Sequence, residues 1–186
     1  PAARDAACRI LVTGPNFAGF CSGTLMNNTS EDKTPYVLTA NHCSANSTIN
    51  DLVNWEFDFL YESSTCANPL LEPVPLKFKG STAMAYTGTD NGESSSDFLL
   101  VRLNSSLSSA SYDFTYMGWD ISNSNFTGTV CYHHPNGDIK KVSHSFGTSE
   151  FSSGTGRGLF GITHLKVVWS PTTNGHSVTA EGSSGS

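Results

Sequence analysis

Short stretches rich in β-branched and aromatic residues recur along the chain, and turn-forming residues separate them. No long window places apolar residues at the i, i+3, i+4 and i+7 spacing of an amphipathic helix, so few helices are expected. Strands of this length, with Gly, Pro, Asn and Ser between them, are typical of an all-β barrel or sandwich. Strands are predicted over Arg9–Thr13, Phe20–Met26, Tyr36–Ala40, Leu52–Tyr61, Val74–Lys79, Phe98–Leu103, Thr129–His133, Lys141–Phe146 and Thr163–Trp169.

The chain divides near its middle. A serine-rich stretch, Asn104–Ser111, is expected to join two halves of similar size, so the predicted domains are 1–110 and 111–186. A chain of 186 residues is long enough for one large domain or two small ones, each with a hydrophobic core.

Composition excludes several classes of protein. Hydrophobic residues make up 37% of the chain and charged residues only 14%, a balance common in extracellular β-proteins. The formal net charge is −6, so phosphate backbones should repel the chain and no nucleic acid is expected as a partner. No apolar run approaches the ~20 residues of a membrane-spanning helix, so no membrane partner is expected either.

The cysteines and histidines do not resemble a metal site. The five cysteines form no C-x-x-C pair, and scattered cysteines in such a chain favour disulfides and an oxidising compartment. Their odd number leaves at least one without a partner inside this chain. No histidine spacing fits zinc, so no metal and no cofactor are expected. His133 and His134 are adjacent and should point to opposite faces of a strand.

Three motifs carry candidate chemistry. TANHC, Thr39–Cys43, follows an apolar strand and places His42 on a rigid element beside a cysteine. SSSDFLLVRL, Ser94–Leu103, places Asp97 directly before a strand expected to be buried, where an ionised carboxylate needs a partner. In EGSSGS, Glu181–Ser186, the glycines allow a tight turn that exposes a serine hydroxyl and lets backbone N–H groups converge.

Each motif also has a structural interpretation. His42 alone would fit a structural histidine, Asp97 a residue that caps a turn, and the last motif a flexible linker. Together they follow the order His, Asp, Ser, which is the order in chymotrypsin and differs from subtilisins and α/β-hydrolases. In an all-β chain this order favours a catalytic triad of His42, Asp97 and Ser184.

With these motifs the sequence resembles the bacterial lysyl endopeptidase family, secreted relatives of trypsin, over nearly its whole length. The blocks HHPN and THL…W are specific to that group rather than to trypsins at large. The matching stretches are CSGTLMNNT, YVLTANHC, STCANP, SDFLLVRL, MGWD, HHPNGDIKKVS, THLKVVWSP and EGSSGS. The resemblance implies an all-β, chymotrypsin-like double β-barrel of two six-stranded barrels, the second truncated at the C-terminus of this chain.

The resemblance also implies roles for individual residues. His42 matches the general base, Asp97 the acid that orients it, and Ser184 the nucleophile. The backbone N–H groups of Gly182 and Ser184 match the oxyanion hole. A disulfide between Cys21 and Cys43, beside the catalytic histidine, matches the family pattern.

Some positions depart from the family. Ser183 stands where trypsins carry an aspartate that pairs with a newly freed N-terminus, so that activation switch is expected to be absent. Cys8 and Cys131 occupy positions where the best-known members have no cysteine; a bridge between them is one possible pairing, with Cys66 left over. Known lysine-specific members carry a tryptophan around Gly154–Gly158, where this chain has none.

The activity implied by the resemblance is that of a secreted, monomeric serine endopeptidase that acts on protein and peptide substrates and prefers cleavage after Lys. Glutamyl endopeptidases share a G-x-S-G-S ending, so specificity for acidic residues stays open. A non-catalytic binding module on a protease scaffold is the other alternative.

Overall fold

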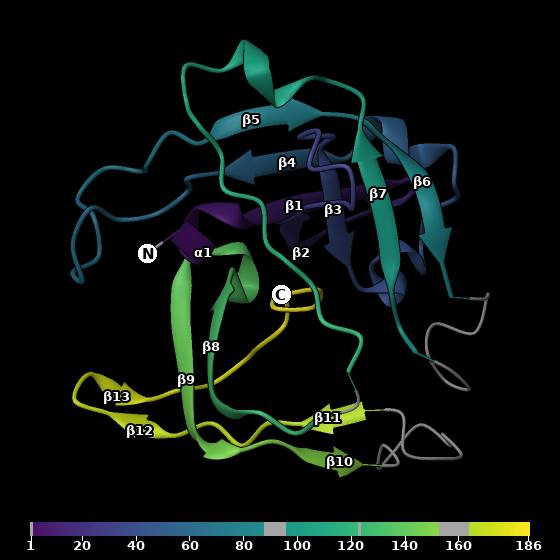
Figure 1. Cartoon of the computed structure of the whole chain (residues 1–186). Helices are drawn as coiled ribbons and strands as arrows, with labels where there is room; N and C mark the ends of the chain where they lie inside the picture. The colour runs from purple at the N-terminus through teal and green to yellow at the C-terminus, as the bar shows by residue number, and fades with distance from the viewer. Residues whose placement is uncertain (1, 88–95, 123, 153–163) are drawn as a thin grey trace.

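A computed structural model describes residues 2–87, 96–122, 124–152 and 164–186. It contains β-strands, one short α-helix and several 3-10 turns (Figure 1). The elements are α1 (Ala2–Ala6), β1 (Ala7–Gly14), β2 (Phe17–Met26), β3 (Tyr36–Thr39), η1 (Asn41–Ser44), η2 (Asp51–Asn54), β4 (Glu56–Phe59), β5 (Leu76–Lys79), β6 (Ser81–Tyr86), β7 (Leu99–Leu103), η3 (Leu107–Ser109), β8 (Thr127–His133), η4 (Pro135–Gly137), β9 (Lys141–Thr148), β10 (Glu150–Ser152), β11 (His164–Lys166), β12 (Pro171–Thr172) and β13 (Gly175–His176).

The first half of the chain forms a closed barrel. Its antiparallel sheet has the order β5-β4-β1-β2-β3-β7-β6, and the two outermost strands are separated along the chain only by Gly80. The Gly80 N–H donates to the carbonyl of Trp55, and the Gly80 carbonyl accepts from the N–H of Asn104. A φ of +83° lets the backbone bend here. Because β5 and β6 act as one bent strand, the sheet closes as the predicted six-stranded barrel.

The core of the barrel consists of the inward-facing residues of these strands. Ile10 and Val12 on β1 are two residues apart, as are Phe57 and Phe59 on β4, so each pair points to one face of its strand. All four residues are fully or almost fully buried. Each buried side chain of this size contributes roughly 1.5–3 kcal/mol relative to an exposed one. Phe114 packs edge to face on Phe59 at 5.2 Å, so the barrel core extends past the domain boundary predicted at residue 110. That boundary stays a prediction.

The second half forms three separate hairpins in the part of the chain that the structure describes: β8–β9, β10–β11 and β12–β13. They lie below the barrel in Figure 1, and the C-terminal residues run back between hairpins and barrel. Backbone bonds from Ser170 to His144 and from Ser177 to Ser170 join the last hairpin to β9. This arrangement agrees with the prediction of an incomplete second barrel. No helix among the described residues is long and apolar enough to cross a membrane.

In the first barrel, one predicted strand range divides and one strand was not predicted. The range Leu52–Tyr61 divides into η2 and β4, because residues 51–54 close a 3-10 turn before the strand begins. Strand β6, Ser81–Tyr86, was not predicted, because its sequence STAMAY has no clear alternation of apolar and polar residues.

Candidate active site

Pairing of β3 with β7 brings His42 and Asp97 together. Thr39, the last residue of β3, pairs with Leu99, the first residue of β7. His42 lies in the 3-10 turn that follows β3, and Asp97 lies two residues before β7. The motifs TANHC and SSSDF are therefore neighbours in space, although 55 residues separate His42 from Asp97.

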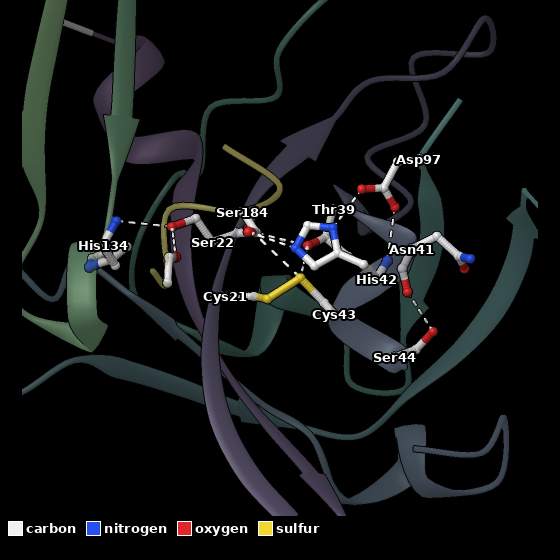
Figure 2. Close-up of a disulfide and its surroundings, with 11 residues drawn as sticks. Cys21, Ser22, Thr39, Asn41, His42, Cys43, Ser44, Asp97, His134 and Ser184 are labelled. Atoms are coloured by element: carbon white, nitrogen blue, oxygen red, sulfur yellow. Dashed lines mark hydrogen bonds and ion pairs between the residues drawn. A yellow bond between two sulfur atoms is a disulfide. The ribbon is translucent and has the colours of Figure 1, made fainter. Parts of the chain in front are cut away.

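The carboxylate of Asp97 contacts His42 twice. Its Oδ1 accepts the backbone N–H of His42 at 2.8 Å, and its Oδ2 lies 2.5 Å from the imidazole Nδ1. On the other side of the ring, His42 Nε2 lies 2.7 Å from Ser184 Oγ. Figure 2 shows these three side chains in line. The structure thus brings together all three residues that the sequence predicts as a triad.

A disulfide fixes the turn that carries His42. Cys21 on β2 is bonded to Cys43, as the family resemblance predicted (Figure 2). The bond ties the turn after β3 to the neighbouring strand, so the position of His42 does not depend on the short 3-10 turn alone.

Strand β2 also holds the loop of Ser184. The backbone N–H of Ser22 donates to the Ser184 carbonyl at 2.8 Å, and the Ser22 hydroxyl donates to the Gly182 carbonyl at 2.8 Å. The Ser22 hydroxyl in turn accepts the N–H of His134 at 2.9 Å. Cys21 and Ser22 are adjacent, so one stretch of β2 positions the loops of both the histidine and the serine.

The turn Glu181–Ser186 presents two backbone N–H groups. Gly182 and Gly185 have φ of +82° and +87°, a conformation that favours glycine. Among the described residues, the N–H groups of Gly182 and Ser184 donate no hydrogen bond. These are the two groups that the resemblance assigns to the oxyanion hole.

A cavity of about 490 Å³ opens beside these residues. The rings of Phe17 and Phe20 line it from β2, and His42 and Ser184 border it together with the disulfide. The cavity is therefore partly apolar and adjoins the hydroxyl of Ser184.

The guanidinium of Arg9 connects the barrel to the η4 turn, a role that sequence analysis missed. Arg9 pairs with Asp58 at 2.7 Å and donates to the Gly137 carbonyl at 2.7 Å. It lies over the rings of Phe20 and Tyr61, at 5.0 and 3.8 Å from their centroids. Planar guanidinium groups suit such combined stacking and pairing.

The η4 turn supports the loop of Ser184 directly. Asn136 donates its N–H to the Glu181 carbonyl at 2.5 Å. A Cβ added at Gly182 would lie 2.7 Å from the carbonyl oxygen of His134, so only glycine fits against this turn. The HHPN block, quoted above as specific to the family, was the one signal in the sequence that could have indicated this supporting role.

His134 is fully buried beneath this turn, and its stability contribution depends on pH. Its Nδ1 lies 2.9 Å from the Asp138 carbonyl, while its Nε2 is buried with no hydrogen-bond partner among the described residues. Burial above all, with smaller effects of Lys140, Arg9 and His133, lowers its pKa from 6.5 to about 3, against the contact with Asp138. The folded protein therefore keeps this ring neutral where the unfolded chain protonates it.

The stability of the folded state is expected to fall as the pH drops from about 6.5 towards 3, by up to about 1.4 kcal/mol per pH unit from His134 alone. Urea denaturation at several pH values measures this slope. His134→Phe, which keeps a ring but cannot titrate, should give a flatter curve over the same range. Parallel curves for the two proteins would show that His134 does not set the slope.

The remaining cysteines are free. Cys8 is fully buried in the barrel core, and burial raises the pKa of its thiol to about 12. Cys131 lies on β8 and donates to Ser186 Oγ at 3.1 Å. The predicted Cys8–Cys131 bridge does not form in this structure, because Cys8 faces the barrel interior instead of β8. Cys66 is free and exposed, and Gly154–Gly158 lie outside the described residues.

Solved bacterial proteases share this fold at low sequence identity. The thermostable serine protease AL20 from an extremophilic microorganism has a TM-score of 0.58 and 14% identity, over 100% of this chain and 78% of that chain. The active form of the Rv3671c protease of M. tuberculosis has a TM-score of 0.57 and 13% sequence identity, over 99% of this chain and 64% of that chain. Protease Anisep of Arthrobacter nicotinovorans has a TM-score of 0.55 and 17% sequence identity, over 100% of this chain and 89% of that chain.

These likenesses, together with the barrel and the hairpins, define the class: the chain has the fold of the chymotrypsin-like serine proteases. A family model described as lysyl endopeptidase, C-terminal domain, matches residues 2–186. The chain therefore belongs to the lysyl endopeptidase family, a family of serine proteases.

Proposed function

We propose that this chain is the catalytic part of a serine endopeptidase in which His42, Asp97 and Ser184 form the triad. The hydrogen-bond chain from the Asp97 carboxylate through the His42 ring to the Ser184 hydroxyl, at 2.5 and 2.7 Å, carries this proposal. Acyl transfer needs a nucleophile and a base within hydrogen-bond distance of each other, and a third group that orients the base.

In the proposed reaction, Ser184 Oγ attacks the carbonyl carbon of the scissile bond while His42 Nε2 takes the hydroxyl proton. The Asp97 carboxylate holds the Nδ1–H tautomer and stabilises the imidazolium that forms. His42 then gives the proton to the leaving amine, and an acyl-enzyme on Ser184 remains. Water, activated by the same histidine, hydrolyses this ester and restores the hydroxyl.

The N–H groups of Gly182 and Ser184 serve as the oxyanion hole in this proposal. They belong to one tight turn and have no competing acceptor among the described residues. Two such donors stabilise the charge that develops on the substrate oxygen in the transition state, which is often the largest electrostatic contribution to catalysis.

The proposed substrates are proteins and peptides, bound by a monomer. The cavity beside Ser184, lined by Phe17 and Phe20, can take an apolar side chain of a bound peptide. A preference for cleavage after Lys is supported by membership of the lysyl endopeptidase family. The same membership and the disulfide Cys21–Cys43 support secretion.

Digestion of a peptide library by the full-length protein, read by mass spectrometry, tests the function. Ser184→Ala is the matched negative control, because it removes only the hydroxyl. The expected result is cleavage after Lys that is absent in the Ser184→Ala digest. Cleavage after Glu that depends on Ser184 would keep the mechanism and replace the specificity. No Ser184-dependent cleavage by folded protein would contradict the proposal and favour a binding module.

A further inference from the structure

A second chain of hydrogen bonds ends on the residue before Ser184. The buried ring of His133 on β8 lies with Nδ1 2.7 Å from Ser183 Oγ and Nε2 3.0 Å from Ser143 Oγ on β9. The Ser143 hydroxyl lies 2.6 Å from the Val178 carbonyl, and the Ala180 N–H donates to Ser183 Oγ at 3.1 Å. The side chains of Ser143, His133 and Ser183 thus connect the β8–β9 hairpin to the loop of Ser184.

The direction of each bond in this chain follows from its ends. A carbonyl only accepts, so the Ser143 hydroxyl donates to Val178 and must accept from His133 Nε2. With hydrogen on Nε2, a neutral imidazole has a bare Nδ1, which accepts the hydroxyl hydrogen of Ser183. Burial lowers the pKa of His133, which favours this neutral form.

Ser183 lies between Gly182 and Ser184, whose N–H groups form the proposed oxyanion hole. Ser183 is buried, with 6% of the residue exposed, and its hydroxyl lies against the His133 ring. A hydroxyl that accepts from Ala180 and donates to His133 has one orientation, so the peptide units on both sides of Ser183 are fixed as well. Ser183 stands where trypsins carry an aspartate. The hydrogen bonds between the uncharged side chains of Ser183, His133 and Ser143 are another way to hold this loop.

We propose that His133 is a positioning residue that orients the loop of Ser184 through the hydroxyl of Ser183; this inference rests on the proposed function. His133 does not touch the reacting atoms. Its role is to set the positions of the Gly182 and Ser184 N–H groups and of the Ser184 hydroxyl, so its loss should lower kcat more than it changes KM.

Two substitutions separate the contacts of His133. In His133→Asn the amide oxygen can take the place of Nδ1 and accept from Ser183, whereas the longer side chain in His133→Gln reaches the place of Nε2 and donates to Ser143. His133→Gln is expected to lower kcat about 10- to 100-fold with KM nearly unchanged, because a buried hydroxyl loses its acceptor. His133→Asn is expected to retain most of the activity. His176→Gln, on the exposed β13, is the control and should match the unsubstituted protein.

The measurements are kcat and KM on one peptide substrate, the thermal midpoint of each variant, and the ¹⁵N spectrum of the histidine rings. A neutral Nε2–H ring for His133, with kcat lowered in His133→Gln alone, supports the inference. Equal losses in both variants, a change in KM only, or an Nδ1–H or charged ring at neutral pH would overturn it. The spectrum needs no activity, and Ser184→Ala run in parallel tests the proposed function separately.

Discussion

Asp97→Asn is expected to lower kcat about 10⁴-fold while KM changes little. The asparagine oxygen can still accept the backbone N–H of His42, as Asp97 Oδ1 does at 2.8 Å. Its NH₂ group then faces His42 Nδ1. Because an NH₂ group only donates, the ring must turn to the tautomer with hydrogen on Nε2, and that nitrogen can no longer take the proton of Ser184.

Steady-state kinetics on a peptide substrate, with a thermal midpoint for each protein, checks this expectation. Asp113→Asn is the matched control, because it makes the same change in an exposed carboxylate that pairs with Lys33 at 3.1 Å. The control should keep full activity. A loss below about tenfold in Asp97→Asn, far short of the effect of a wrong tautomer, would contradict the proposed role of Asp97.

The arrangement around His42 was accessible from the sequence because each part of it is local. His42 and Asp97 each flank an apolar strand, and neighbouring strands β3 and β7 bring the ends together. Ser184 lies in a turn whose glycines are visible in the sequence. The order His, Asp, Ser indicated the triad, and the family resemblance supported the choice of Ser184 within EGSSGS and the pairing of Cys21 with Cys43.

Other contacts between distant parts of the chain could not be predicted from the sequence. Arg9 and Gly137 are 128 positions apart, and no periodicity in either segment indicates that they meet. The Cys8–Cys131 prediction failed for the same reason, since the inward orientation of Cys8 follows from the register of β1. Strand β6 was missed because its sequence STAMAY has no clear alternation of apolar and polar residues. The sequence also does not show that Gly80, with its positive φ, lets one strand bend and close the barrel.

Gly185→Ala is expected to destabilise the folded protein by about 2–5 kcal/mol, from backbone strain and overlap together. With a φ of +87° at this position, an added Cβ would lie 2.2 Å from Thr39 Oγ1 and 2.4 Å from the Ser22 carbonyl oxygen. Both neighbours belong to strands of the barrel, so the loop must move instead. Activity should fall as well, because the bond between Ser22 and the Ser184 carbonyl holds the nucleophile.

Substitutions at two other glycines separate the effect of backbone strain from that of atomic overlap, when the free energy of unfolding of each variant is measured in urea. Gly175 has a φ of +118° and no atom within 4 Å of an added Cβ, so Gly175→Ala measures the backbone strain alone. Gly118 also has open space, without a positive φ, so Gly118→Ala should be nearly neutral. If Gly185→Ala were no worse than Gly175→Ala, the loop would have room to adjust, and close packing of Gly185 against Thr39 and Ser22 would not be what holds Ser184 in place.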